Sequence, residues 1–268
     1  MTRRRLQLIG PLVVALACLA GCSSSVGTAS STTATSSTSS STGGTPGAAA
    51  SAVLKVGSTG PAVLKLQQRL TALGYRPGSV DGHFGAATSS AVLAFQKRQG
   101  LARDGVAGPA VLAALDHPTG AGPRSGGPTP RIEVDIARQI AFVVLPGQPV
   151  VTLNVSTGSG KTYPKPGGGT DVADTPTGTF AIVSKVAANQ KAPLGTLYYP
   201  MYFYKGWALH GSPSIPGYPA SHGCVRMSNV DDDWLFPKVL VGTPVIIYDT
   251  TGKSPAVTKL PGDAAGGS

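Results

Sequence analysis

The sequence predicts an α+β chain of several domains, in which a small three-helix bundle is followed by a mainly antiparallel, β-sandwich-like domain. Between Val63 and Leu73, apolar residues recur at spacings of three and four, which is the period of a helix. From Arg131 onward, apolar residues alternate or form short runs between Gly and Pro residues, which is typical of strands. A Gly- and Pro-rich segment, residues 116–130, separates the two regions as a linker.

The N-terminus has the layout of an export signal. Three arginines precede an apolar-rich run, Leu6 to Ala20, which is too short to span a bilayer. The run leads into Leu19-Ala20-Gly21-Cys22, which resembles a bacterial lipobox, whose Cys is lipidated and becomes the new N-terminus. We therefore expect a lipoprotein signal peptide over 1–21, lipid attachment at Cys22 and an extracytoplasmic, membrane-anchored protein. An ordinary secretion signal cleaved nearby is the alternative.

Composition narrows the classes of partner. The net charge is +10, yet only 13% of residues are charged, and no run of Lys and Arg is interleaved with aromatic residues. This pattern argues against a nucleic-acid partner. Residues 22–52 carry no charge, are dominated by Ser and Thr, and precede the first aromatic residue, Tyr75. Such a segment cannot build a core, so we expect a flexible tether there and a flexible tail over 250–268.

Residues 53–115 are expected to form the helical domain. The first helix begins at Pro61, because Pro suits the first helical position, and ends at Gly74. A second helix is expected after Thr88, with Val92 and Phe95 facing inward, and a third begins near Pro109. Two related Asp-Gly turns introduce the second and third helices and are interpreted as structural turns when taken singly.

Taken together, these residues resemble the three-helix type of peptidoglycan-binding domain. The resemblance rests on Gly74-Tyr75, Asp81-Gly82, Asp104-Gly105, Gln67, Phe95-Gln96 and Gly100-Leu101. It covers essentially all of residues 53–115 and implies binding to the cell wall. Val111 stands where that family often has Thr.

The second domain, residues 131–249, is expected to be rich in short strands. Ile132, Val134 and Ile136 alternate as on a half-buried strand. Further strands are expected over 141–145, 150–155, 179–183, 207–210 and 245–248. Residues 231–241 are expected to form a helix capped by Ser228 or Asn229, whose acidic first turn suits the positive end of the helix dipole.

Cysteine usage points to chemistry. If Cys18 leaves with the signal and Cys22 is lipidated, Cys224 is the one remaining thiol. It lies in Ser221-His222-Gly223-Cys224-Val225-Arg226, fourteen residues after His210. A thiol nucleophile needs a base in hydrogen-bond reach, and a histidine on a neighbouring strand would supply one. On a strand His222 and Cys224 would share a face, and amides around Gly223 could form an oxyanion hole.

Two other interpretations stay open at this point. Cys224, His222 and His210 could hold a metal ion, although a structural zinc site usually has four ligands. The cluster could also be accidental core packing, although such a polar, Gly-containing run is atypical of a core.

The segment resembles the signature of the L,D-transpeptidase catalytic domain, a His followed after about a dozen residues by Ser-His-Gly-Cys. Ser156-Thr157-Gly158 and Thr175-Pro176-Thr177-Gly178 resemble further signatures of that family. The resemblance implies that Cys224 is the nucleophile, that His210 is its base, and that the Gly211 carbonyl orients that base. It also implies that His222, Gly223 and Ser221 shape the oxyanion and substrate pocket. Arg226 stands where many members have Asn, and a role in holding a substrate carboxylate is expected.

The reaction implied is a two-step acyl transfer on peptidoglycan stem peptides, without a metal or cofactor. Cys224 attacks the carbonyl of the third residue of a stem tetrapeptide, D-alanine leaves, and an acceptor amine resolves the thioester into a cross-link. Carbapenems are expected to acylate the same Cys. Hydrolysis by the same thiol, as an L,D-carboxypeptidase, and a non-catalytic wall-binding lipoprotein are the alternatives.

Six aromatic residues lie just before His210, and they could wall a donor cleft or simply pack against the sheet. They are Tyr198, Tyr199, Tyr202, Phe203, Tyr204 and Trp207.

Overall fold

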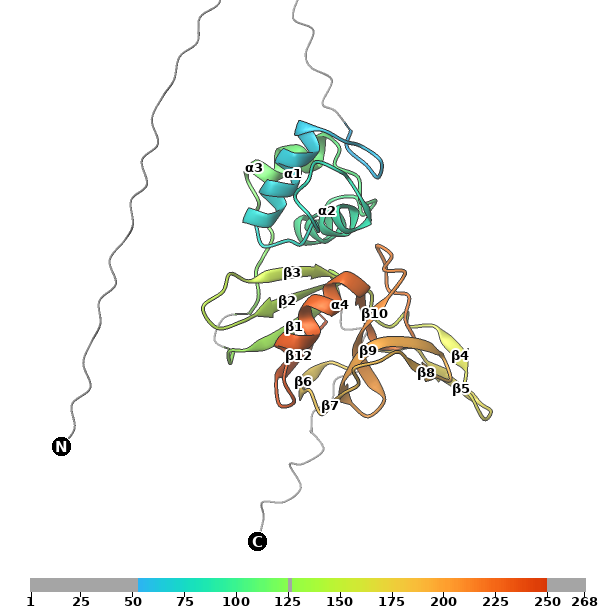
Figure 1. The fold of residues 1–268 in the computed structure, drawn as a ribbon. Coiled ribbons are helices and arrows are strands. Elements are labelled where there is room, and N and C mark those ends of the chain that lie inside the picture. Colours follow the sequence, from blue (N-terminus) through green and yellow to red (C-terminus); the bar gives the residue numbers. More distant parts are fainter. Residues whose placement is uncertain (1–52, 125–126, 250–268) are drawn as a thin grey trace, which may run out of the picture. The chain divides into compact units, whose positions relative to one another are not determined.

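A computed structural model describes residues 53–124 and 127–249. The expected signal peptide, Cys22, the tether and the tail lie outside the described residues. Three helices come first: α1 (Pro61–Ala72), α2 (Ala86–Gln99) and α3 (Pro109–Asp116). The remainder is mostly strands (Figure 1), which confirms the predicted α+β layout with several domains. Among the described residues no helix has the length and apolar character needed to cross a membrane.

The strands and the last helices follow in chain order. They are β1 (Arg131–Asp135), β2 (Ile140–Val144), β3 (Val151–Asn154), β4 (Thr162–Pro164), β5 (Thr170–Val172), β6 (Gly178–Ala181), β7 (Ser184–Lys185), β8 (Gln190–Ala192), β9 (Gly195–Tyr204), β10 (Trp207–Ser212), β11 (Val225–Ser228), α4 (Asn229–Leu235), the 3₁₀-helix η1 (Phe236–Lys238) and β12 (Pro244–Tyr248).

The two Asp-Gly turns of the helical domain are each held by a buried glutamine. The Gln67 side chain accepts hydrogen bonds from the backbone amides of Asp81 and Gly82 and donates one to the His83 carbonyl. Gln96 holds the turn at Asp104 in the same way. The turns are therefore structural, as expected. The prediction that the second helix begins after Thr88 is wrong, because α2 already begins at Ala86, following Gly85 as its N-cap.

Two sheets share one hydrophobic core. The first has the order β3-β2-β1-β12-β6 and the second β11-β10-β9-β7, with β8 paired to β9. Two pairs are parallel, β1 with β12 and β10 with β11, and the other pairs are antiparallel. Residues of both sheets, Val134 and Phe180 from the first and Leu209 and Met227 from the second, belong to the same buried cluster.

Strand β1 is buried on both faces, so the prediction of a half-buried strand is wrong. All five of its residues are buried, including Arg131, Glu133 and Asp135. The polar residues are buried because they have partners: Arg131 Nε lies 2.6 Å from Glu133 Oε1, and Arg138 Nη1 lies 2.7 Å from Asp135 Oδ2.

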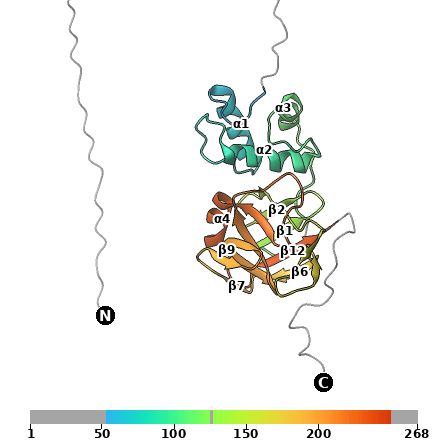
Figure 2. The ribbon, with the colours of Figure 1, turned by 90° about the vertical axis from the view of Figure 1, so that its right-hand side faces the viewer.

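Helix α4 differs from its predicted range of 231–241. It begins at Asn229 and ends at Leu235, where η1 takes over. Ser228 caps it as predicted, since its hydroxyl accepts the Asp231 amide at 3.1 Å. The acidic first turn is not a solvated helix end, because Asp231 and Asp232 are both buried. α4 packs against β9 and β10 (Figures 1 and 2), which carries these carboxyls beneath the strand that holds His210.

Lys97 of α2 is buried against the strand domain. Its ammonium donates to Asn154 Oδ1 at 2.6 Å, Val155 O at 2.8 Å, Gln139 O at 3.1 Å and Pro216 O at 3.3 Å. Pro216 belongs to the segment between β10 and Ser221, so the helical domain is joined directly to the chain that leads to Cys224.

Candidate active site

The parallel pairing of β10 with β11 brings the predicted histidine and cysteine into one neighbourhood. His210 is level with Arg226, and Leu209 is level with Val225. Leu209 and Val225 face the core, so His210 and Arg226 face the other way. Cys224 immediately precedes β11, and the positive charge of Arg226 lowers the pKa of both Cys224 and His210. The two predicted reactive groups therefore lie within the field of one guanidinium.

His210 is oriented by its neighbour in the chain. Its Nδ1 lies 2.8 Å from the carbonyl oxygen of Gly211. A carbonyl only accepts, so Nδ1 carries the proton and Nε2 keeps a free lone pair. The pKa of His210 is lowered to about 4, mainly by burial; the Gly211 hydrogen bond raises it and the Arg226 charge lowers it. At neutral pH the imidazole is uncharged and able to accept a proton.

Cys224 is a free cysteine that is partly buried. Burial raises the pKa of the thiol, while a hydrogen bond with the Ala208 backbone and the charge of Arg226 act in the opposite direction. The sulfur lies 3.9 Å from the Gly206 carbonyl oxygen. The resting group is therefore a thiol, and its use as a nucleophile requires a base.

The segment that presents Cys224 is a bend, not a strand. The Ser221 hydroxyl donates to the Cys224 carbonyl at 2.5 Å and accepts the Gly223 amide at 3.0 Å. The prediction that His222 and Cys224 share a strand face is wrong, because Gly223 between them has φ of 128° and β11 begins only at Val225. Ser221 is buried and braces the bend from inside.

Thr175 fixes the same bend from the neighbouring loop. Its hydroxyl donates to the Gly223 carbonyl at 2.6 Å and accepts the Gly158 amide at 2.8 Å. Both Thr175 and Gly158 belong to the two shorter signatures noted in the sequence. The structure therefore joins three separate sequence signatures into one hydrogen-bonded support for Cys224.

Gly223 is required by its surroundings. A Cβ atom at this position would lie 2.4 Å from Trp207 Nε1 and 2.7 Å from the Asp174 carbonyl oxygen. The indole itself is held by a hydrogen bond from Nε1 to that carbonyl, at 3.0 Å. The Gly223 amide, expected as an oxyanion donor, is already bonded to Ser221.

His222 differs from His210 in its exposure to solvent. It is exposed, and its ring makes a T-shaped contact with Tyr163 at a centroid distance of 4.8 Å. Tyr163 comes from β4, in a small two-stranded sheet with β5. Burial is the main cause of the raised pKa of Tyr163 and of Tyr202, and a negative charge on Cys224 contributes to both. Sequence reasoning missed Tyr163, since no pattern connects β4 to the Cys224 segment.

The six aromatic residues before His210 divide between packing and the site. Phe203 is buried in the core, and Tyr204 and Trp207, which stack at 5.7 Å, pack against it. The Tyr198 hydroxyl donates to Asp233 at 2.7 Å. Of the six, Tyr202 is the one whose pKa responds to Cys224. The packing interpretation therefore holds for at least half of them.

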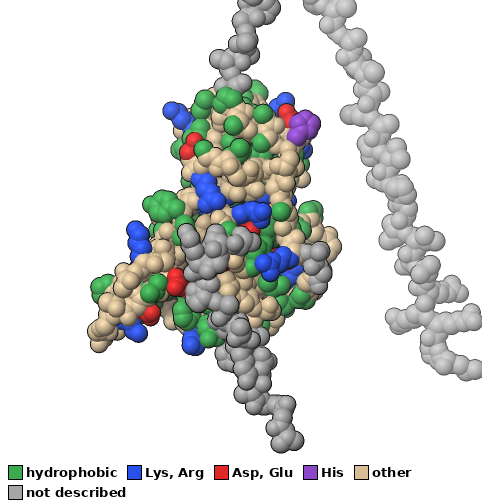
Figure 3. All heavy atoms as spheres, turned by 180° about the vertical axis from the view of Figure 1, so that it is seen from behind, with side chains coloured by type: hydrophobic (Ala, Val, Ile, Leu, Met, Phe, Trp, Pro, Cys, Tyr) green, Lys and Arg blue, Asp and Glu red, His purple; other side chains and the backbone are tan. Residues whose placement is uncertain are grey.

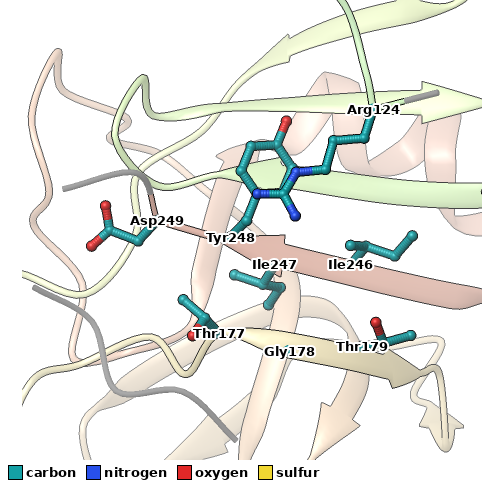
Figure 4. A pocket seen from close by; sticks show the side chains of 8 residues that line it. All are labelled: Arg124, Thr177, Gly178, Thr179, Ile246, Ile247, Tyr248 and Asp249. Atoms are coloured by element: carbon teal, nitrogen blue, oxygen red, sulfur yellow. The ribbon is translucent and has the colours of Figure 1, made fainter. Parts of the chain in front are cut away.

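The pocket lined by β6 and β12 contains none of the predicted site residues. This pocket, of about 300 Å³, lies over β6 and β12, where the Arg124 guanidinium sits 3.8 Å above the Tyr248 ring (Figure 4). In residues 53–124 and 127–249 no group of three or more His, Cys, Asp or Glu side chains could hold a metal ion. On the face seen in Figure 3, Lys and Arg side chains are scattered and form no continuous patch.

Family models match both parts of the chain. Residues 129–247 match the L,D-transpeptidase catalytic domain, and residues 59–115 match a putative peptidoglycan binding domain. Among solved structures, an L,D-transpeptidase from Xylanimonas cellulosilytica is 45% identical with a TM-score of 0.70, and the match covers 76% of this chain and 100% of that one.

Curated relatives share only a segment. N-acetylmuramoyl-L-alanine amidase CwlM of Mycobacterium tuberculosis is 48% identical over 56 residues, which is 21% of this chain and 14% of that protein. The zinc D-Ala-D-Ala carboxypeptidase of Streptomyces albus G is 49% identical over 67 residues, 23% of this chain and 25% of that protein. The chain thus spans a quarter or less of these two relatives.

Proposed function

From the premise that this chain belongs to the L,D-transpeptidase family, we propose that it cross-links peptidoglycan through a thioester on Cys224. The observation that carries the proposal is the His210 side chain, whose Nδ1 is bonded to the Gly211 carbonyl and whose uncharged ring shares the field of Arg226 with Cys224. This arrangement supplies a proton acceptor for a thiol that burial keeps protonated.

In the first step, His210 Nε2 takes the proton of the thiol as the sulfur attacks the carbonyl carbon of the third residue of a stem tetrapeptide. The bond from that carbon to the D-alanine nitrogen breaks, and the imidazolium returns its proton to the leaving amine. D-alanine departs and a thioester remains. The charge of Arg226 favours the thiolate and keeps the resting imidazole uncharged, and it also favours return of the proton from the imidazolium to the leaving amine.

In the second step, the side-chain amine of an acceptor stem attacks the thioester carbon. His210 accepts the proton of that amine, the carbon–sulfur bond breaks, and the thiol is restored. Water in place of the amine would give the L,D-carboxypeptidase reaction. The exposed ring of His222 lies on the bend that carries Cys224 and contacts the half-buried ring of Tyr163, and we assign both to the walls of the substrate site.

The remaining roles follow from position. Gly211 orients His210, Ser221 and Gly223 hold the bend, and Arg226 tunes both reactive groups. We further propose that residues 53–115 hold the enzyme on peptidoglycan, and that a lipid on Cys22 anchors it outside the cytoplasm, facing the cell wall. Carbapenems would acylate the same sulfur.

The test uses purified wild type and Cys224→Ala with a donor tetrapeptide, with and without an acceptor peptide. We expect a cross-linked product and free D-alanine from wild type, neither from the variant, and a carbapenem adduct mapped to Cys224. Release of D-alanine without any cross-link would favour the carboxypeptidase. Binding to peptidoglycan with neither product nor adduct would favour a non-catalytic wall-binding lipoprotein.

A further inference from the structure

A buried carboxyl group lies behind the histidine, on the helix that packs against β10. Asp232 of α4 is fully buried, and its Oδ2 accepts the backbone amide of Gly211 at 3.0 Å. The carbonyl of the same glycine receives Nδ1 of His210. One residue, Gly211, therefore connects the Asp232 carboxyl to the imidazole ring.

The contact leaves Gly211 no freedom to shift toward α4. A Cβ atom on Gly211 would lie 2.7 Å from a Tyr198 ring carbon, 2.8 Å from Asn229 Oδ1 and 3.1 Å from Asp232 Oδ2. The glycine is thus packed directly on these three side chains. A change in the length or shape of the Asp232 side chain would move the Gly211 backbone, and with it the acceptor that sets the His210 ring.

The surroundings of Asp232 favour an uncharged acid. Within residues 53–124 and 127–249, neither its Oδ1 nor the buried Oδ1 of Asn229, which lies against the same glycine, has a hydrogen-bond partner. Two acceptors without a donor are costly in a buried site, and a proton on the carboxyl turns one of them into a donor.

Taken together, the charged groups around Asp232 raise its pKa and so also favour the uncharged acid. Asp231 and Asp233 flank it on α4, and Lys185 of β7 opposes them. The Lys185 ammonium, however, donates to the carbonyls of Phe236 and Val239. The pKa of Asp232 is raised to about 8, mainly by burial; the hydrogen bond from the Gly211 amide and the charge of Lys185 lower it, and the charges of Asp233 and Asp231 raise it.

We propose that Asp232 is a positioning residue for the reaction on Cys224: as an uncharged acid beneath β10 it holds the Gly211 backbone, and through Gly211 it fixes the ring and tautomer of His210. The purpose of this role rests on the proposed function, but the role can be measured without assuming that function. The side chain touches no reacting atom and acts only through His210.

The test measures the rate at which iodoacetamide alkylates Cys224 in the full chain, mapped by peptide mass spectrometry so that other cysteines do not interfere. Asp232→Asn keeps the shape and the acceptor of the acid, whereas Asp232→Ala removes both. We expect Asp232→Asn to react within twofold of wild type at pH 6.5 and Asp232→Ala to react at least tenfold more slowly. The exposed Val230 of the same helix, changed to Ala, serves as the matched control and should match wild type.

A double-mutant cycle separates positioning from general damage. In a His210→Ala background, Asp232→Ala should cost no further loss of alkylation rate, because its effect passes through the imidazole. Carboxyl ¹³C NMR should show a titration near pH 8 in wild type that is missing in Asp232→Asn. If Asp232→Ala does not fold by circular dichroism, Asp232→Ser takes its place in both backgrounds.

The proposal is overturned if the truncated variant reacts like wild type, if Asp232→Asn is as slow as the truncation, or if the losses add in the His210→Ala background. Alkylation needs no peptidoglycan. A wild type that forms no cross-link would therefore contradict the proposed function alone, whereas cross-linking unchanged in Asp232→Ala would contradict the positioning role alone.

Discussion

His210 and Arg226 lie level with each other on the parallel strands β10 and β11. The guanidinium lowers the pKa of the imidazole and also that of the Cys224 thiol. One cation therefore disfavours protonation of the base and favours ionisation of the nucleophile. The sequence predicts that Arg226 holds a substrate carboxylate. Its electrostatic effect on His210 and Cys224 is evident only once the pairing of β10 with β11 is known.

Replacement of Arg226 by Met should raise the pKa of both groups. Because one pKa unit corresponds to a factor of ten in the equilibrium, we expect alkylation of Cys224 at pH 7.5 to slow by about 3- to 10-fold. Mapped alkylation rates against pH measure the effect. Arg226→Lys, which keeps the charge, should lie near wild type; equal slowing in both variants would show that shape, not charge, matters.

The low pKa of His210 predicts the acidic limit of the reaction. Burial lowers it to about 4, so the base is available well below the usual titration range of histidine. Since the unfolded chain binds this proton near pH 6.5 and the folded chain does not, folding stability should fall by about 3 kcal/mol as pH decreases from 6.5 to 4. NMR titration of the His210 ring and denaturation of His210→Gln, which lacks this slope, test it; a midpoint above 6 would contradict it.

Loss of the Thr175 hydroxyl should release the bend that carries Cys224. Thr175→Val removes the donor to the Gly223 carbonyl and the acceptor of the Gly158 amide, and it leaves both groups unpaired. We expect a loss of about 2 kcal/mol in the free energy of unfolding and a fall of tenfold or more in Cys224 alkylation. Thr175→Ser keeps the hydroxyl and should recover most of the stability and most of the alkylation rate. If it recovers neither, the hydrogen bonds are not the cause of the losses.

A methyl group at residue 223 should be strongly destabilising. In Gly223→Ala the new Cβ would meet Trp207 Nε1 at 2.4 Å and the Asp174 carbonyl oxygen at 2.7 Å, at a φ of 128°. We expect a loss of more than about 2 kcal/mol, measured by urea denaturation. Gly206→Ala is the matched control, because a Cβ atom there would meet nothing within 4 Å and the φ of Gly206 is not positive. Similar losses in the two variants would contradict the packing argument.

Lys97 should matter for stability more than any exposed lysine. Lys97→Met leaves the carbonyls of Gln139, Val155 and Pro216 and the Asn154 side chain without their shared donor. We expect a loss of at least about 3 kcal/mol in thermal or denaturant unfolding. Lys65→Met, on the exposed side of α1, is the control and should change little.

The pH dependence of unfolding provides a second measurement at Lys97. Burial lowers the pKa of this lysine to about 7, below that of the unfolded chain. The unfolded state therefore binds more protons between pH 7 and 10, and wild-type stability should rise with pH in that range. A wild-type slope no different from that of Lys97→Met would contradict this.

Local sequence determined the elements and the chemical groups. The spacing of Val63, Leu66 and Leu70 defines a helix, and the runs at Ile140 and Val245 define strands, because a short stretch of chain is enough to bury one face of either. The thiol of Cys224 and the imidazole of His210 were recognisable from residue type and from the surrounding signature.

Tertiary structure decided which side chains support these groups. The supporting residues come from three different elements: Thr175 from a loop, Tyr163 from a small separate sheet and Asp232 from a helix. Their position at the site depends on the path of the folded chain and cannot be predicted from sequence periodicity. The burial of β1 and of the first turn of α4 was likewise not predicted, because a charged residue is buried only where the folded chain gives it a partner, whether close in sequence, as Arg131 is to Glu133, or distant, as Gly211 is to Asp232. Periodicity is a property of residues that are close in sequence. The meeting of distant residues at one site depends instead on strand register and on the paths of the loops, and these exist only in the folded chain.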